Sequence, residues 1–215
     1  RLIAYKKRKK AEKEHEVAIK KAKEEYMMTD YYLSTHNEYE SIFFRKTGKY
    51  GEYALYVSLN EIVGYKRLLF NCYIPKEDGS TSEVDAIMIS NAGICVIESK
   101  DFQGMIFGTD RDEMWVQTIE RNSNFSQQNK FLNPMIQNEI HVKSIKQYLG
   151  EELPIYSLVV FGDRADIKNI SNQNRMTTVI NIRDVITVMN KSINKLGMKL
   201  SNEKVEEIVE KPVAM

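Results

Sequence analysis

Two acidic residues and a lysine occupy positions in the sequence that suit metal-ion chemistry. Asp85 lies in the run EVDAIMIS at Glu83–Ser90, and Glu98 and Lys100 end the run GICVIESK at Gly93–Lys100. Alternate residues of a strand face the same side, so Glu98 and Lys100 are expected to project together. If the two runs pair as strands, Asp85 comes close to Glu98. Two carboxylates beside a lysine would be costly as mere core residues of apolar runs.

These residue types match what phosphodiester hydrolysis requires. Mg²⁺ binds through a few carboxylates, with water and substrate oxygens completing its octahedron, and Mn²⁺ accepts similar ligands. Lys100 would position or deprotonate the attacking water, or stabilise the negative charge that develops on the phosphate. The alternative interpretation is a surface salt bridge between Lys100 and a neighbouring acid, because a Glu-x-Lys triplet is common by chance.

The spacing of apolar residues and turns predicts the elements that must hold these side chains. A helix over 50–63 is followed by strands over 66–75, 83–90 and 93–100. The turn at 91–93 is short enough for a hairpin, so the last two strands should be antiparallel. Further along, we expect short strands at 104–108 and 114–119, a helix at 134–149, strands at 155–161 and 177–182, and a helix at 184–196. This order predicts an α/β fold with a mixed central sheet flanked by helices.

The chain divides by composition into three parts, at 1–46, 47–200 and 201–215. Residues 1–46 are rich in Lys, Glu and Ala, which predicts an exposed, poorly packed helical arm with pairs of opposite charge four residues apart. The middle part is the compact domain, and the last is a tail. The basic start RLIAYKKRKK, which lacks a Met, favours a membrane span upstream of Arg1 with the chain facing the cytoplasm. A cloning boundary would give the same start.

The overall composition is that of a globular protein and excludes several classes of site. Lys and Arg number 31 against 30 Asp and Glu, so the net charge says little about partners. Cys72 and Cys95 lie in apolar runs and are expected to be reduced core thiols, and no Cys/His spacing suits zinc. No phosphate-binding loop, serine nucleophile elbow or dinucleotide fingerprint is present.

Four separate segments resemble the nuclease-related domain, or NERD, within the PD-(D/E)xK nuclease superfamily. They are GKYGEYALYVSL at 48–59, EVDAIMISNAGICVIESKDFQG at 83–104, Trp115, and NPMIQNEIHVKSIKQYL at 133–149. Their order and spacing make the resemblance far more specific than the triplet alone. It implies a restriction-endonuclease-like fold with nuclease activity. One departure is Val84-Asp85, which stands where the superfamily's name has Pro-Asp.

The resemblance also implies a role for each matching residue. Asp85 would be the central metal ligand, Glu98 the second ligand and Lys100 the catalytic lysine. Glu52 would be a further acidic ligand or would orient the water on the metal. Gln137 would reach toward the site or the DNA backbone. Residue-level alternatives stay open: Glu52 can be an exposed helix acid, Gln137 and His141 can be surface neighbours, and Glu83 can replace Asp85 as a ligand.

The interpretation that follows is a cytoplasmic-facing nuclease domain that cuts DNA with Mg²⁺ or Mn²⁺. A catalytically silent module that binds nucleic acid or protein is the first alternative, although such a module has no need to keep Asp85, Glu98 and Lys100 together. A membrane-tethered scaffold, in which the charged arm is the functional part, is the second. The sequence leaves the oligomeric state open.

Overall fold

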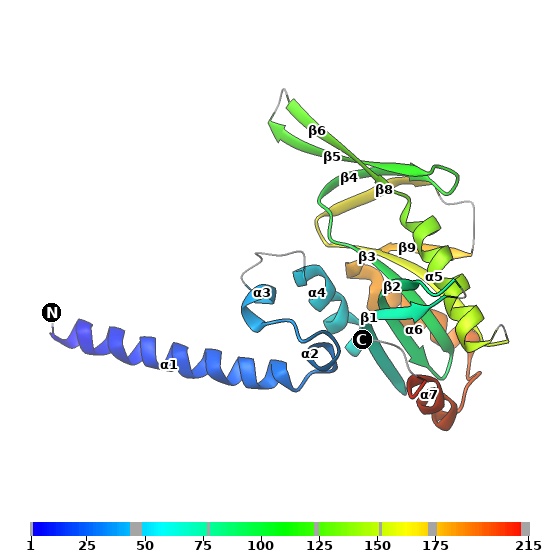
Figure 1. Ribbon diagram of the computed structural model, residues 1–215. Coiled ribbons are helices and arrows are strands. Elements are labelled where there is room, and N and C mark those ends of the chain that lie inside the picture. Colours follow the sequence, from blue (N-terminus) through cyan, green and yellow to red (C-terminus); the bar gives the residue numbers. More distant parts are fainter. Residues whose placement is uncertain are drawn as a thin grey trace.

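The computed structural model describes residues 2–43, 49–76, 78–122, 125–150, 152–171 and 176–211. Within these residues the chain forms two mixed β-sheets with helices packed around them, and one long helix projects from the body (Figure 1). The predicted α/β class, with a restriction-endonuclease-like mixed sheet, is confirmed. The predicted domain start at Thr47-Gly48 and the last four residues lie outside the described part.

The central sheet has the strand order β1-β2-β3-β7-β9. Its strands are β1 (Lys66–Pro75), β2 (Thr81–Ser90), β3 (Gly93–Lys100), β7 (Ile155–Phe161) and β9 (Thr177–Asn181). The expected hairpin is confirmed, because β2 and β3 are antiparallel and pair from Ser90↔Gly93 inward. The apolar strand β7 runs parallel to β3, as its composition predicted. Gly93 is required at this turn, since a Cβ there would lie 2.5 Å from the Pro154 carbonyl oxygen.

A second sheet, with the order β6-β5-β4-β8, was only half predicted. It contains β4 (Gly104–Thr109), β5 (Met114–Asn122), β6 (Phe125–Leu132) and β8 (Ala165–Ser171). The sequences of β6 and β8 are polar and lack a clear alternation. Amide pairing compensates in part: the Asn129 side chain donates to Gln117 on the neighbouring strand at 3.1 Å. Trp115 is fully buried and stacks on Phe161 of the central sheet, which joins the two sheets.

Helices cover both faces of the central sheet. One core lies beneath α4 (Lys49–Asn60) and α6 (Val185–Leu196), which follows the short 3₁₀ helix Ile182–Asp184. The other lies beneath α5 (Pro134–Leu149) and α7 (Asn202–Val209). Helix α7 falls in the segment expected to be a tail. Its Val205 and Ile208 are buried against the sheet, so that segment contributes to the core through at least residue 208.

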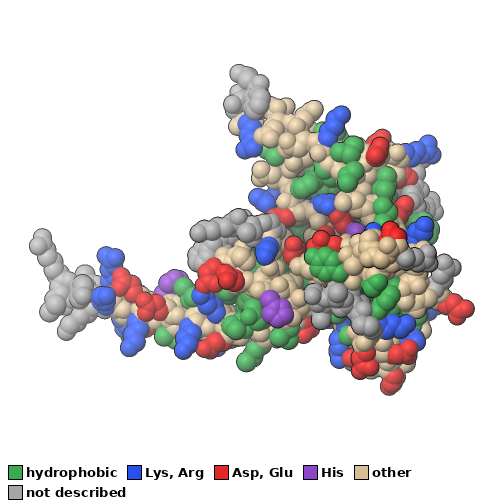
Figure 2. All heavy atoms as spheres, viewed as in Figure 1, with side chains coloured by type: hydrophobic (Ala, Val, Ile, Leu, Met, Phe, Trp, Pro, Cys, Tyr) green, Lys and Arg blue, Asp and Glu red, His purple; other side chains and the backbone are tan. Residues whose placement is uncertain are grey.

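The N-terminal segment is helical, but its first part is exposed and its second part packs against the domain. Helix α1 (Leu2–Met27) projects from the body, and basic Lys and Arg side chains are intermixed along it with acidic Glu side chains (Figure 2). Pairs of opposite charge four residues apart occur along it, such as Lys20 with Glu24. No helix among the described residues is long and apolar enough to span a membrane. The span predicted from the basic start was placed before Arg1 and stays a prediction.

The expectation of poor packing is wrong from Tyr26 onward. Tyr26, Tyr31 of α2 (Asp30–Thr35) and Ile42 of α3 (Tyr39–Phe43) are buried in the core shared with α4. Tyr31 meets Phe70 of β1 edge to face, with ring centroids 5.2 Å apart. Aromatic residues therefore supply, between residues 26 and 43, the apolar surface that the Lys- and Glu-rich stretch lacks.

Candidate active site

The site lies where strands β2 and β3 separate. Their pairing ends at Ala86↔Ile97, immediately before Asp85 and Glu98 would pair. Beyond that point the Ser99 N–H donates to Oδ2 of Asp85 at 2.7 Å. The Asp85 side chain thus takes the place of a backbone carbonyl in the ladder, and this fixes it beside the Glu-x-Lys triplet.

Glu98 and Lys100 project together, as the strand alternation predicted. The Lys100 ammonium donates to Oε1 of Glu98. The Glu98 side chain is nearly enclosed, since the residue is 4% exposed. Strand β3 remains paired with β7 through Lys100↔Phe161, so the triplet is carried on a buried, rigid strand.

His141 of α5 contacts the other oxygen of Glu98. Its Nε2 lies 3.2 Å from Oε2 of Glu98, and its Nδ1 lies 2.8 Å from the buried hydroxyl of Ser82. Nε2–H donates to Glu98 in the protonated imidazole, and it also does so in the neutral tautomer whose Nδ1 accepts from the Ser82 hydroxyl. The interpretation of His141 as a surface neighbour is therefore wrong. Ser82 was not considered, and regular strand alternation gives no signal that would have placed it beside His141.

Gln137 lies one helical turn before His141 and is half-buried. Among the described residues its side chain has no hydrogen bond to Asp85, Glu98 or Lys100. Its predicted contact with the site or with a phosphate therefore stays a prediction.

The two carboxylates of the site have opposite protonation tendencies. Burial and the adjacent charge of Glu98 raise the pKa of Asp85 to about 6, although the Ser99 N–H and Lys100 act in the other direction. Burial also opposes ionisation of Glu98, but hydrogen bonds and charge from His141 and Lys100 outweigh it, so the pKa of Glu98 is lowered. The site is therefore a closely spaced acidic pair in which Asp85 is the less stable anion, and a bound cation would relieve this repulsion.

Glu52 approaches from α4, on the other side of the sheet from His141. Its carboxylate accepts a hydrogen bond from the Tyr31 hydroxyl at 3.1 Å, and the side chain of Asn71 lies near enough to favour its charged form. Burial raises the pKa of Glu52, and the charge of Glu52 in turn contributes to the raised pKa of Asp85. Glu52 is thus a half-buried residue close to the site, not an exposed helix acid. Tyr31, its partner, lies in the segment that sequence analysis treated as a separate arm.

A model of the nuclease-related domain family matches residues 47–162, which is more than half of the chain. The chain belongs to the nuclease-related domain family. The match includes Glu52, Asp85, Glu98, Lys100 and Gln137. A relative from Bacillus anthracis, itself described as uncharacterized, is 28% identical over 142 residues. That alignment covers 66% of this chain and 63% of the relative, so the chain spans less than two thirds of the relative's length.

The acidic side chains of this nuclease-related domain can supply two carboxylate ligands for a divalent cation, but they do not form a larger ligand group. Among the described residues, no three His, Cys, Asp or Glu side chains are grouped as ligands for one ion. Glu52 is therefore not brought into a common coordination group with Asp85 and Glu98. Mg²⁺, however, is commonly held through one or two carboxylates, with water and substrate phosphates as the other ligands. Asp85 and Glu98 fit that pattern.

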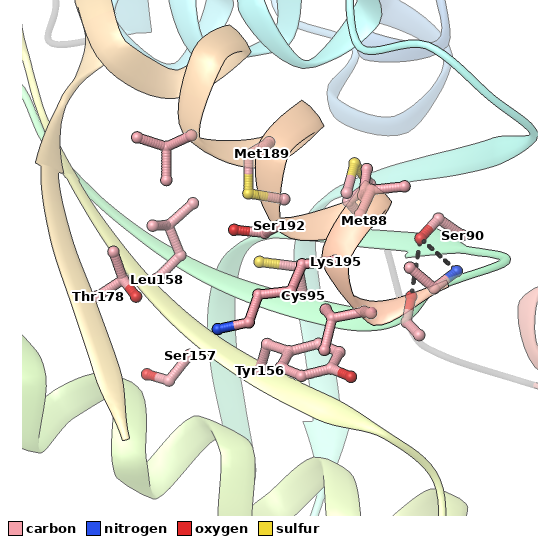
Figure 3. Close-up of a pocket in the computed structure, with 15 residues that line it drawn as sticks. Met88, Ser90, Cys95, Tyr156, Ser157, Leu158, Thr178, Met189, Ser192 and Lys195 are labelled. Atoms are coloured by element: carbon pink, nitrogen blue, oxygen red, sulfur yellow. Dashed lines mark hydrogen bonds between the residues drawn. The ribbon is translucent and has the colours of Figure 1, made fainter. Parts of the chain in front are cut away.

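One cavity against the central sheet lies away from this site. About 260 Å³ lies between the sheet and α6, and Cys95, Met189, Ser192 and Lys195 are among its lining residues (Figure 3). No Asp or Glu lines it, and it lies toward the hairpin end of β3, away from Glu98. It therefore offers no ligand for a cation, and the acidic pair remains the candidate site.

A shallower hollow of about 230 Å³ borders the acidic site. Gly51, Asp101, Gly162 and Arg183 contribute to its lining. A Cβ on Gly51 would lie 2.5 Å from the Asp101 Cβ, so only glycine allows α4 to come this close to the end of β3. This close approach places the next residue, Glu52, beside the acidic pair. Figure 2 shows acidic, basic and histidine side chains together where the two sheets meet.

Proposed function

We propose that this nuclease-related domain hydrolyses phosphodiester bonds in DNA with Mg²⁺ or Mn²⁺ held by Asp85 and Glu98. The observation that carries the proposal is the convergence of these carboxylates and Lys100 at the point where β2 and β3 separate. A bound cation would neutralise phosphate charge and acidify a water molecule there. Membership of the family supports the same reaction class.

Each of the remaining site residues would have its own role in the proposed hydrolysis. The Lys100 ammonium, held at the mouth of the site by Glu98, would hold the attacking water or stabilise the charge that develops on the phosphate. His141 keeps the Glu98 carboxylate in one orientation. Glu52, held by the Tyr31 hydroxyl, would orient water and not serve as a direct ligand. Gln137 would contact the nucleic-acid backbone from the first turns of α5.

A silent binding module is the second candidate, and one observation favours it. Both oxygens of Glu98 already have partners, Lys100 and His141, as they would in a purely structural salt bridge. A buried pair of this kind contributes little to stability by itself. The two candidates differ in whether a cation binds to Asp85 and Glu98 and supports cleavage.

Incubation of the purified chain with linear and circular DNA tests the proposal. Cleavage is expected with Mg²⁺ or Mn²⁺ and is expected to stop with EDTA. Lys100→Ala should slow cleavage by about 10²–10⁴-fold, whereas Lys199→Ala, which changes an exposed lysine at the hairpin end of β3, should not. Metal-dependent binding of DNA without cleavage in the wild type would instead support the binding module.

A further inference from the structure

Asn71 has a backbone conformation that a strand residue does not normally adopt. It lies inside β1 with φ 52°, in the left-handed region. Among the described non-glycine residues only His36 shares this feature, and His36 caps the end of a helix. Non-glycine residues in this region are uncommon and cluster at functional sites when the surrounding structure enforces them.

This conformation occurs at the same level as Asp85. The pairs Phe70↔Ala86 and Cys72↔Val84 are both formed, so Asn71 lies opposite Asp85 between them. The distorted residue and the central carboxylate of the proposed site therefore face each other across neighbouring strands.

At this level the alternation of side chains between the two faces of the sheet is interrupted in both strands. Along β1, Phe70 belongs to the core beneath α4 and α6, whereas Cys72 belongs to the core beneath α5 and α7. Along β2, Ala86 lies in the first core and Val84 in the second. Residues two apart on a regular strand share a face, so the alternation reverses in each strand. Because both strands reverse together, the pairing register is unchanged on either side.

The reversal directs side chains into the site. Ser82, two residues before Val84, faces α5 and meets Nδ1 of His141, whose Nε2 contacts Glu98. Without the reversal, regular alternation from Ala86 would turn Ser82 toward α4 and away from His141. The orientation of His141 thus depends on the backbone at Asn71.

The Asn71 side chain acts on the opposite face. It lies near the carboxylate of Glu52 on α4, where it favours the charged form and so lowers the pKa of Glu52 against the effect of burial, and the charge of Glu52 in turn acts on Asp85. Asn is suited to both tasks, since it tolerates the left-handed region and carries an N–H₂ donor. Glycine would keep the backbone and lose the donor, and alanine would lose both.

We propose that Asn71 is a positioning residue of the Asp85–Glu98 site. Its backbone sets the paired reversal of β1 and β2 that turns Ser82 toward His141, and its amide holds Glu52 in place. Its part in catalysis rests on the proposed nuclease function, but its part in building the site does not.

Thermal unfolding of four variants tests the backbone requirement without any activity. At Asn71 the glycine variant should melt at a higher temperature than the alanine variant, because only glycine adopts the left-handed region freely. Tyr73, further along β1 with ordinary strand geometry, is the matched control. There Tyr73→Ala should melt above Tyr73→Gly. The same order at both positions would overturn the proposal.

Hydrogen exchange at the Ser99 amide reads out the site itself, since that N–H is held by Asp85. Asn71→Ala should lower its protection by about tenfold or more, whereas Asn71→Gly should leave it near the wild-type value. Equal protection in the wild type and Asn71→Ala would contradict a positioning role. Both outcomes are available even if the wild type cleaves nothing, in which case only the proposed nuclease function fails.

If the wild type cleaves DNA, Asn71→Gly tests the side-chain amide alone, because glycine keeps the left-handed backbone. This variant should lower kcat with KM nearly unchanged, and Glu52→Gln should do the same. The double variant should be no slower than the slower single variant, because both changes remove one shared interaction. Additive losses would show that the Asn71 amide acts independently of Glu52 and would overturn that part of the proposal.

Discussion

At the scale of single residues, Glu98 is held more firmly than any other acid of the site. Lys100 engages one of its oxygens and His141 the other, and Ser82 holds His141 from behind. Asp85, by contrast, is held through one oxygen by the Ser99 N–H, and its pKa is raised by burial and by the charge of Glu98. The pair therefore combines a fixed anion with one that gains most from an incoming cation.

Removing His141 should weaken metal binding through Glu98. Partners behind a metal ligand typically contribute about 10–100-fold in affinity, so His141→Ala should weaken Mn²⁺ binding by that factor in calorimetric titration. Ser82→Ala should act in the same direction with a smaller effect. Ile140→Ala, an exposed neighbour on the same helix, is the control. Unchanged affinity in His141→Ala would mean that the histidine is only a packing residue.

At the scale of elements, the boundary within the N-terminal segment is functional as well as structural. Residues 8–25 are largely exposed, whereas Tyr31 of α2 is buried and donates to Glu52. The start of α1 therefore projects freely, and α2 completes one wall of the site.

Truncation and a point substitution should separate these two parts. Deletion of residues 1–25 should leave the melting temperature nearly unchanged, because the side chains of residues 8–25 are largely exposed. Tyr31→Phe removes two hydrogen bonds, one donated to Glu52 and one accepted from Asn37, so it should lower the free energy of unfolding by about 1–3 kcal/mol. Thermal and denaturant melts measure both. A large loss of stability on deletion would show that α1 packs more than its exposure indicates.

The elements also show where sequence reasoning succeeds. The hairpin of β2 and β3, and with it the proximity of Asp85, Glu98 and Lys100, followed from strand alternation and one short turn. These are local properties, so they can be read from a single sequence. The strands β6 and β8 could not be predicted, because their sequences are polar and lack a clear alternation. In β6 the polar Asn129 is paired with Gln117 of β5, a contact that exists only once the strands have formed.

The remaining site residues depend on contacts between distant segments. Tyr31 reaches Glu52 across 21 residues, and His141 reaches Glu98 across 43. The sequence gives one local indication of Asn71, since it is the only amide residue in the apolar run LLFNCYI. Its left-handed backbone, however, is fixed by pairing with β2. The role of Gln137 remains a prediction from the family resemblance.

At the scale of the whole molecule, two cores on either side of the central sheet enclose both cysteines. Cys72 lies beneath α5 and α7, Cys95 beneath α4 and α6, and burial raises the pKa of each thiol to about 12. Both thiols are therefore neutral and shielded at neutral pH. Neither should react with a thiol reagent until the chain unfolds.

Reaction with a chromogenic disulfide reagent along a urea series checks this expectation. Both thiols should become reactive in the same transition that removes the helical circular dichroism signal, as expected for cooperative unfolding of the two cores. Rapid labelling of one thiol in the native protein would show that its core opens separately.

The central claim is that Asp85 and Glu98 bind the cation and Lys100 supports the chemistry. The measurement that tests it most directly is a DNA cleavage time course for Lys100→Ala at Mn²⁺ concentrations shown by calorimetry to saturate it. Lys100→Ala should bind Mn²⁺ at least as well as the wild type, because a nearby positive charge is removed. Its rate should fall by about 10²–10⁴-fold, the usual contribution of a positioned acid–base group. Asp85→Asn and Glu98→Gln should lose both binding and cleavage. A wild-type rate in Lys100→Ala would contradict the account.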